Sequence, residues 1–126
     1  MNNNINSKTN ITENLATVKG AVDTIEASID ALEFIGSIKN PTEEVLFFAG
    51  NILLEIGKLM DNCERALDKT LLLFSSASKE DFDAVDVNTL LEEYIIVSHN
   101  YLNVKKKAES TIMDEAYLKT IFNQNT

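Results

Sequence analysis

The chain contains few of the residues that interrupt or cross-link secondary structure. Its 126 residues include 4 glycines, 1 proline, 1 cysteine, 1 histidine and no tryptophan. The single cysteine, Cys63, excludes an internal disulfide, and the single histidine, His99, argues against a histidine-based zinc site. A sheet-rich fold needs more turn-forming residues than this. The composition therefore favours long helices with few connections.

Positive charge is also scarce, with 11 Lys and Arg residues against 20 Asp and Glu, a net charge of −9. This balance argues against a nucleic-acid interface, which needs basic clusters to neutralise phosphate. No run approaches about 18 consecutive apolar residues, so no membrane span is predicted. The polar first residues, MNNNINSKTN, do not resemble a secretory signal. We expect a cytoplasmic protein that binds neither nucleic acid nor membrane.

A heptad-like apolar seam follows an Asn-rich start. Residues 1–9 are expected to be disordered, and Asn10 with Glu13 fits a helix-capping box. Apolar residues then recur at alternating spacings of three and four: Leu15, Val18, Val22, Ile25, Ile29 and Leu32. Such a seam is typical of a helix that packs lengthwise against another helix.

The only proline marks the clearest break in the chain. Asn40 as N-cap with Pro41 at the first helical position predicts a kink or a second helix start here. An apolar stripe follows from Val45 to Phe74, and it includes Phe48, Ile52, Ile56 and Leu59. Its width favours contacts on more than one side, as in a bundle. Glycines at positions 50 and 57 leave open whether residues 41–77 form one helix or a hairpin.

A third helix is expected to begin near Asn88 or Thr89, after an acidic linker. Its predicted buried face comprises Leu90, Leu91, Tyr94, Ile95, Val97, Tyr101, Leu102 and Val104. A last helical piece is expected from Ile112 to Phe122, before a polar tail at residues 123–126. The sequence thus predicts one all-α domain over residues 10–122. We expect a long helical hairpin that completes a four-helix bundle as a homodimer, with residues 15–32 or the central helix at the interface.

The candidates for chemistry are few. A helical histidine such as His99 can act as a phosphoacceptor or general base, but positions 95, 96, 102 and 103 supply no acid to orient its ring. We expect Cys63, on the apolar stripe, to be a buried structural thiol. No metal site, cofactor or enzymatic activity is predicted.

Four segments, in order along the chain, resemble parts of sensor histidine kinases. Residues 36–41, Gly-Ser-Ile-Lys-Asn-Pro, resemble the phosphoacceptor box, usually His-Glu-Ile-Asn-Asn-Pro. Residues 62–75 resemble the end of the second dimerisation helix, and residues 82–93 the junction with the ATP-binding domain. Residues 113–123 resemble the approach to that domain's first nucleotide-binding motif.

The departures from this pattern shape what the resemblance implies. Gly36 stands where the family has its phosphoacceptor histidine, while Asn40 and Pro41 match the end of the box. No autophosphorylation can occur at Gly36, and the Gly-rich ATP lid is missing from the sequence. The resemblance implies a non-catalytic, dimerising relic of the kinase core, either a truncated kinase or a complete regulator.

Three functions follow from the sequence. The first is a non-catalytic interaction module, a bacterial regulator that docks an unidentified signalling partner such as a receiver domain or a kinase. The second is a histidine phosphotransfer protein that uses His99. The third is an acidic inhibitor of a basic protein, carried by a phage or mobile element, since the net charge of −9 suits a basic target.

Overall fold

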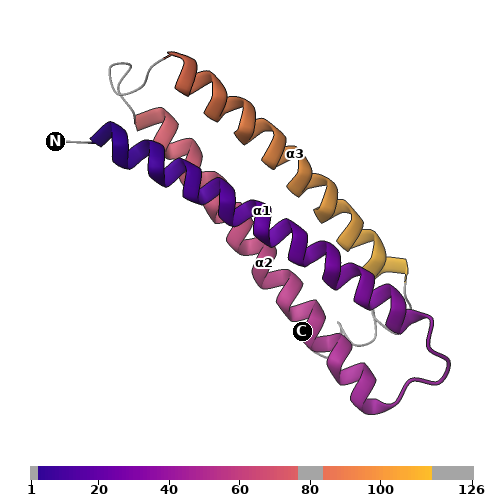
Figure 1. The fold of residues 1–126 in the computed structure, drawn as a ribbon. Coiled ribbons are helices and arrows are strands. Elements are labelled where there is room, and N and C mark those ends of the chain that lie inside the picture. The colour runs from indigo at the N-terminus through magenta and orange to yellow at the C-terminus, as the bar shows by residue number, and fades with distance from the viewer. Residues whose placement is uncertain (1–2, 77–83, 115–126) are drawn as a thin grey trace.

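The computed structural model describes residues 3–76 and 84–114, and these residues form three helices and no strand (Figure 1). The helices are α1 (Asn3–Gly36), α2 (Glu43–Ser76) and α3 (Ala84–Asp114). The all-α class predicted from the composition is confirmed. The expected helical piece up to Phe122 extends beyond the described residues, and the polar tail lies outside them.

The three helices lie lengthwise beside one another, with α1 antiparallel to α2 and parallel to α3 (Figure 1). Both α2 and α3 pack extensively on α1, whereas α2 and α3 meet each other much less. Helix α1 is therefore the central element, and one side of the α2–α3 pair has no fourth helix against it among the described residues. None of the described helices combines the length and apolar character that crossing a membrane requires.

The predicted seam of α1 lies in the hydrophobic core. Leu15, Val18, Val22, Ile25, Ile29 and Leu32 are all at most 6% exposed. Because α2 and α3 cover these side chains, the seam serves packing within the chain and is not accessible to a second copy. On α2, Ile56 is also buried, Ile52 and Leu59 are partly buried, and Phe48 is exposed.

The chain reverses direction between α1 and α2 in a turn rather than a kink. The end of α1 is closed by the backbone N–H of Ser37, which donates to the Phe34 carbonyl at 3.0 Å. Asn40 has a φ of 54°, a left-handed conformation that asparagine tolerates better than most residues. This conformation reverses the chain and places Asn40 too early to cap α2. The N-cap is Thr42 instead, whose Oγ1 accepts the Val45 N–H at 3.2 Å.

Two helices begin earlier than the sequence predicts. Helix α1 begins at Asn3, within the segment predicted to be disordered, and α3 begins at Ala84 rather than near Asn88. An ion pair of 2.9 Å joins Lys8 to Asp86 and links these two early turns. Helix α2 is continuous through Gly50 and Gly57, so residues 43–76 form one helix rather than a hairpin.

Candidate functional site

Helix α3 has an apolar face that the core does not use. Its core face comprises Leu90, Val97, Tyr101, Val104 and Ala108, all buried. The predicted buried face also contained Leu91, Ile95 and Leu102, but these side chains are 38%, 64% and 53% exposed. With Ser98 they lie at spacings of four, three and four, which places them along one side of the helix. We call Leu91, Ile95, Ser98 and Leu102 the outer stripe.

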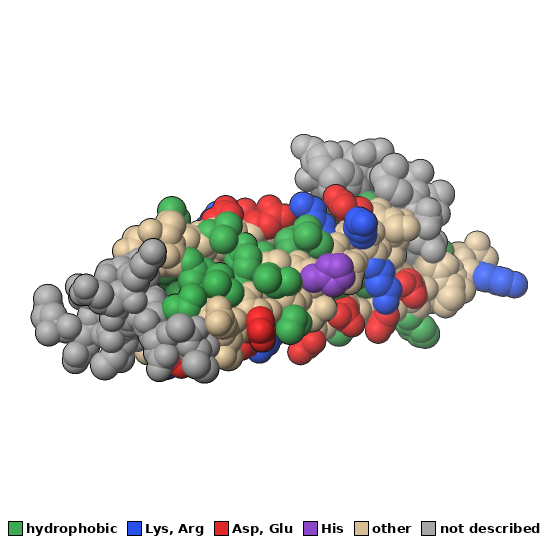
Figure 2. All heavy atoms as spheres, turned by 90° about the horizontal axis from the view of Figure 1, so that it is seen from above, with side chains coloured by type: hydrophobic (Ala, Val, Ile, Leu, Met, Phe, Trp, Pro, Cys, Tyr) green, Lys and Arg blue, Asp and Glu red, His purple; other side chains and the backbone are tan. Residues whose placement is uncertain are grey.

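Figure 2 views the molecule from the α3 side and shows hydrophobic side chains gathered next to His99. The apolar surface continues from α3 onto α2. The rings of Phe74 and Tyr94 meet edge to face, with centroids 6.2 Å apart. Leu71, one turn earlier on α2, is 48% exposed. The outer stripe is therefore part of a surface shared by two helices.

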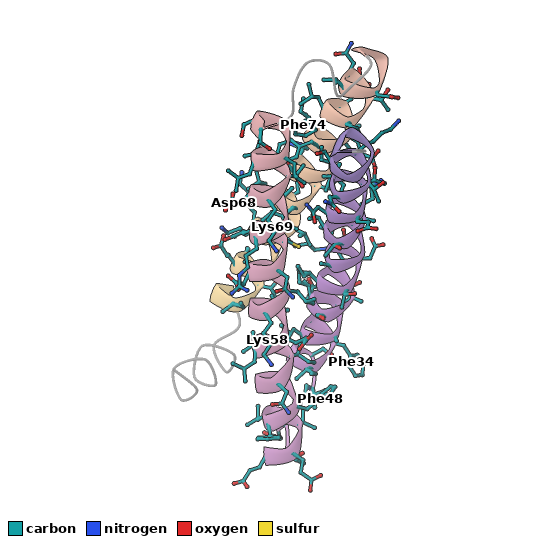
Figure 3. The ribbon with its side chains drawn as sticks, turned by 90° about the vertical axis from the view of Figure 1, so that its left-hand side faces the viewer. Phe34, Phe48, Lys58, Asp68, Lys69 and Phe74 are labelled. Atoms are coloured by element: carbon teal, nitrogen blue, oxygen red, sulfur yellow. The ribbon has the colours of Figure 1, made fainter. Side chains whose placement is uncertain are left out.

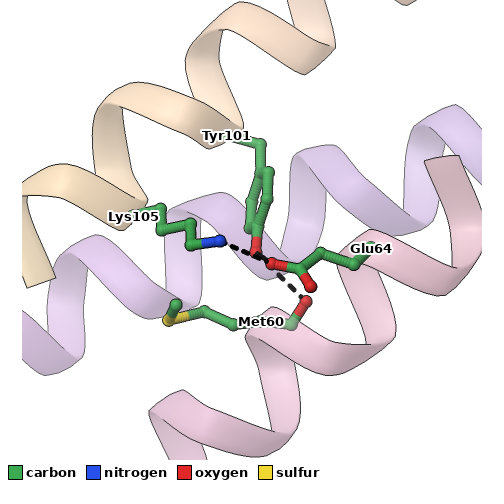
Figure 4. Close-up of polar contacts among 4 residues, drawn as sticks. All are labelled: Met60, Glu64, Tyr101 and Lys105. Carbon is green, nitrogen blue, oxygen red and sulfur yellow. Dashed lines mark hydrogen bonds and ion pairs between the residues drawn. The ribbon is translucent and has the colours of Figure 1, made fainter. Parts of the chain in front are cut away.

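A polar junction joins α2 and α3 at the other end of this shared edge (Figure 4). The Tyr101 hydroxyl donates to Glu64 Oε2 at 2.6 Å and lies 3.2 Å from the Met60 carbonyl oxygen. Lys105 Nζ donates to the same carboxylate oxygen at 3.0 Å. This junction fixes the position of α3 along α2.

The protonation states of the junction residues favour a stable contact between α2 and α3 rather than proton transfer. Hydrogen bonds from Tyr101 and then Lys105 lower the pKa of Glu64, because they stabilise the carboxylate. Burial, and then the hydrogen bond to Glu64, raise the pKa of Tyr101. At neutral pH Glu64 is therefore charged and Tyr101 keeps its proton. Sequence reasoning missed the junction, since Glu64 and Tyr101 are 37 positions apart.

A second exposed apolar surface lies at the end of the molecule that carries the α1–α2 turn. At this end Phe34, Phe47, Phe48 and Leu54 are each more than half exposed, and we call these four side chains together the hairpin-end surface. Figure 3 shows Phe34 and Phe48 at this end of the α1–α2 pair. Phe47 and Leu54 are seven residues apart on α2, so they share one side of that helix, whereas Phe48 points about 100° away from them. The apolar pattern alone had placed Phe48 on the packed stripe.

The two candidate nucleophiles, His99 and Cys63, differ in exposure. His99 is exposed on α3, and none of the ion pairs found in the described residues involves it. Cys63 is fully buried, which confirms the prediction of a buried thiol. Burial, and then the charge of Glu64, raise the pKa of the Cys63 thiol to about 11, so the thiol is protonated at neutral pH.

The segment that resembles a phosphoacceptor box lies at the α1–α2 turn. Gly36 is the last residue of α1, and Asn40 and Pro41 lie in the turn itself. Within residues 3–76 and 84–114, no three His, Cys, Asp or Glu side chains are grouped closely enough to hold a metal ion.

One open groove of about 470 Å³ lies where the start of α1 meets the end of α2. It is lined by Asn10, Asn14, Lys69, Leu72, Leu73, Ser75 and Ser76. This lining offers two leucine side chains, amide and hydroxyl groups and one cation, without a paired acid and base. The two exposed apolar surfaces are therefore stronger candidates for a binding site than the groove.

No model of a known protein family, no curated protein and no solved structure matches this chain.

Proposed function

We propose that the chain is a non-catalytic helical interaction module that binds a protein partner through the hairpin-end surface. The observation that carries this proposal is the exposure of Phe34, Phe47, Phe48 and Leu54 at one end of the molecule. Apolar side chains gathered on a surface often mark a binding site. Aromatic residues are enriched in the cores of protein interfaces.

The charges near this surface indicate what kind of partner fits. Glu33, Glu43, Glu44 and Glu55 are exposed on the neighbouring turns of α1 and α2. Lys39 and Lys58 are fewer, so acid predominates around the apolar centre. A partner with an apolar recess bordered by Lys or Arg complements this arrangement. The resemblance to histidine-kinase segments makes a receiver domain or a kinase the first class of partner to test.

The test is a comparison of matched variants in capture from the native cell, followed by titration with the purified partner. Phe47→Ser removes a large exposed side chain from the hairpin-end surface. Leu72→Ser removes one from α2 outside this surface, with 67% exposure against 73% for Phe47. We expect wild type and L72S to capture the same partner and F47S to lose it. Because an aromatic anchor is worth about 2 kcal/mol or more, affinity should fall by at least ~30-fold.

Circular dichroism should show the same helical content in all three proteins, because both altered side chains are exposed. Equal affinity of F47S and wild type for the partner would refute the hairpin-end surface as the binding site. An affinity that collapses in salt for wild type and F47S alike would instead favour the acidic inhibitor of a basic protein.

A further inference from the structure

The outer stripe of α3 is left without a role by the fold and by the proposed partner site. Leu91, Ile95 and Leu102 are exposed, whereas other residues on a different side of the same helix pack in the core. We propose that the outer stripe binds a second copy of this chain, with the two α3 helices antiparallel. This proposal does not depend on the hairpin-end surface.

The spacing of the stripe makes it self-complementary. The intervals of four, three and four read the same in both directions along the helix. When two copies run antiparallel, Leu91 lies against Leu102 of the second copy, and Ile95 lies against Ser98 of the second copy. Each contact occurs twice, as the twofold symmetry of a homodimer requires. The layers have the heptad spacing of an antiparallel coiled coil.

The charges on α3 select the same partner and the same direction. The half of α3 before Ser98 carries Asp86, Glu92 and Glu93 and no basic residue. Asp86 and Glu93 already pair with Lys8 and Lys19 of α1, which leaves exposed Glu92 for a second copy. The half after Ser98 carries Lys105, Lys106 and Lys107, with Glu109 and Asp114. Lys105 already pairs with Glu64 of α2, which leaves exposed Lys106 and Lys107. Antiparallel pairing places the half of α3 that carries Glu92 beside the half of the other copy that carries Lys106 and Lys107. Parallel pairing would place acid beside acid and lysine beside lysine.

Ser98 fits the centre of such an interface. Its hydroxyl oxygen is shielded from solvent and finds no hydrogen-bond partner among the described residues. Its small side chain leaves room for Ile95 of the second copy, which lets the two helices approach closely.

The shared edge of α2 and α3 gives the second helix further contacts. Leu71, Phe74 and Tyr94 lie beside the stripe on this edge, and the described residues place no helix of the chain over it. A second α3 seated here brings α2 and α3 of both copies together, which makes a four-helix arrangement. The core seam of α1 stays within each copy.

Sedimentation equilibrium with two adjacent isoleucines tests the interface. Ile95 and Ile96 are 64% and 59% exposed, but one helical residue of rotation places Ile96 away from the stripe. Ile95→Glu inserts a charge into the interface and should raise the dimer dissociation constant by at least ~100-fold. Ile96→Glu should leave the dimer intact. A monomeric wild type, or equal effects of the two variants, would overturn the proposal.

Cysteine cross-linking tests the direction of pairing. Leu91→Cys and Leu102→Cys are prepared as separate proteins, with wild type as the control for buried Cys63. Antiparallel pairing predicts an intermolecular disulfide when the two variants are mixed and oxidised, and none when either is oxidised alone. A disulfide between two copies of L91C, when this variant is oxidised by itself, would show parallel pairing and refute the proposed orientation. If I95E is monomeric yet still binds the partner, dimerisation and partner binding use separate surfaces.

Discussion

Helices α1 and α3 have almost the same length but use their apolar residues differently. The apolar seam of α1 faces inward throughout, and Ile25 and Ile29 are fully buried. Helix α3 buries Val97 and Tyr101 in the same way, but it also exposes Ile95 and Leu102 on another side. Packing within the chain accounts for the apolar seam of α1, and the exposed Phe34 near its end belongs to the hairpin-end surface. The sequence of α3 serves both packing and a surface that suits association, and the following predictions probe this difference.

The largest effect is expected in the seam of α1. Ile25→Ala should lower the free energy of unfolding by about 2–5 kcal/mol, because it removes buried methyl groups and leaves a cavity. Ile96→Ala on exposed α3 should change it by less than about 0.5 kcal/mol. Urea denaturation at equal protein concentration measures both. Similar losses in the two variants would contradict the division between a core helix and a surface side.

A smaller effect is expected at the junction that holds α3 on α2. Tyr101→Phe should lower the free energy of unfolding by about 1–2 kcal/mol, because it removes the hydroxyl that donates to Glu64 and lies near the Met60 carbonyl. Tyr94→Phe is the control, since the Tyr94 hydroxyl makes no hydrogen bond to the described residues. Urea denaturation should separate the two variants, and equal stabilities would remove the junction as a stabilising contact.

The junction also predicts a modest dependence of stability on pH. The folded-state pKa of Glu64 is lowered by Tyr101 and then Lys105, so the native state binds the Glu64 proton less readily than the unfolded state. The stability from this group is therefore present above the ordinary value of 4.5 and lost as the pH falls through the lowered pKa. Glu64→Gln should flatten this part of the pH profile of the unfolding midpoint. If the unfolding midpoint of E64Q fell with acid in the same way as that of wild type, Glu64 would not contribute to the pH dependence.

The smallest effect is expected at His99. His99→Ala should leave stability within about 0.5 kcal/mol of wild type, because the ring is exposed and forms no ion pair with the described residues. Partner binding should also be unchanged. Incubation with receiver domains charged by acetyl phosphate should leave no phosphate on His99. Phosphate that appears in wild type and is lost in H99A would instead establish the phosphotransfer role.

Sequence patterns predicted the elements better than their relative rotation. The alternation of threes and fours from Leu15 to Leu32 predicted a packed helix, and Pro41 predicted the break between α1 and α2. Residue preferences for helix caps favoured Asn40 as the N-cap of α2, but the structure uses Thr42. The sequence did not reveal this because Asn40 adopts its left-handed conformation only as part of the chain reversal. The start of α1 was missed because an Asn-rich composition does not reveal a contact such as Lys8 with Asp86.

The exposed surfaces show the same limit of sequence patterns. Leu90 and Leu91 are adjacent leucines, and only the placement of α3 on α1 and α2 decides which one is buried. The Glu64–Tyr101–Lys105 junction depends on the register between two helices, which no local spacing encodes. Both the outer stripe and the junction therefore required the three-dimensional arrangement.

The most direct test of two distinct apolar sides on α3 compares positions 95 and 97, two residues apart, by sedimentation and circular dichroism. Val97 is 1% exposed and faces the core, whereas Ile95 is 64% exposed on the outer stripe. We predict that Val97→Glu loses helical structure, while Ile95→Glu keeps its helical content and sediments as a monomer beside a dimeric wild type. An I95E protein that unfolds like V97E, or one that remains a dimer, would contradict the account.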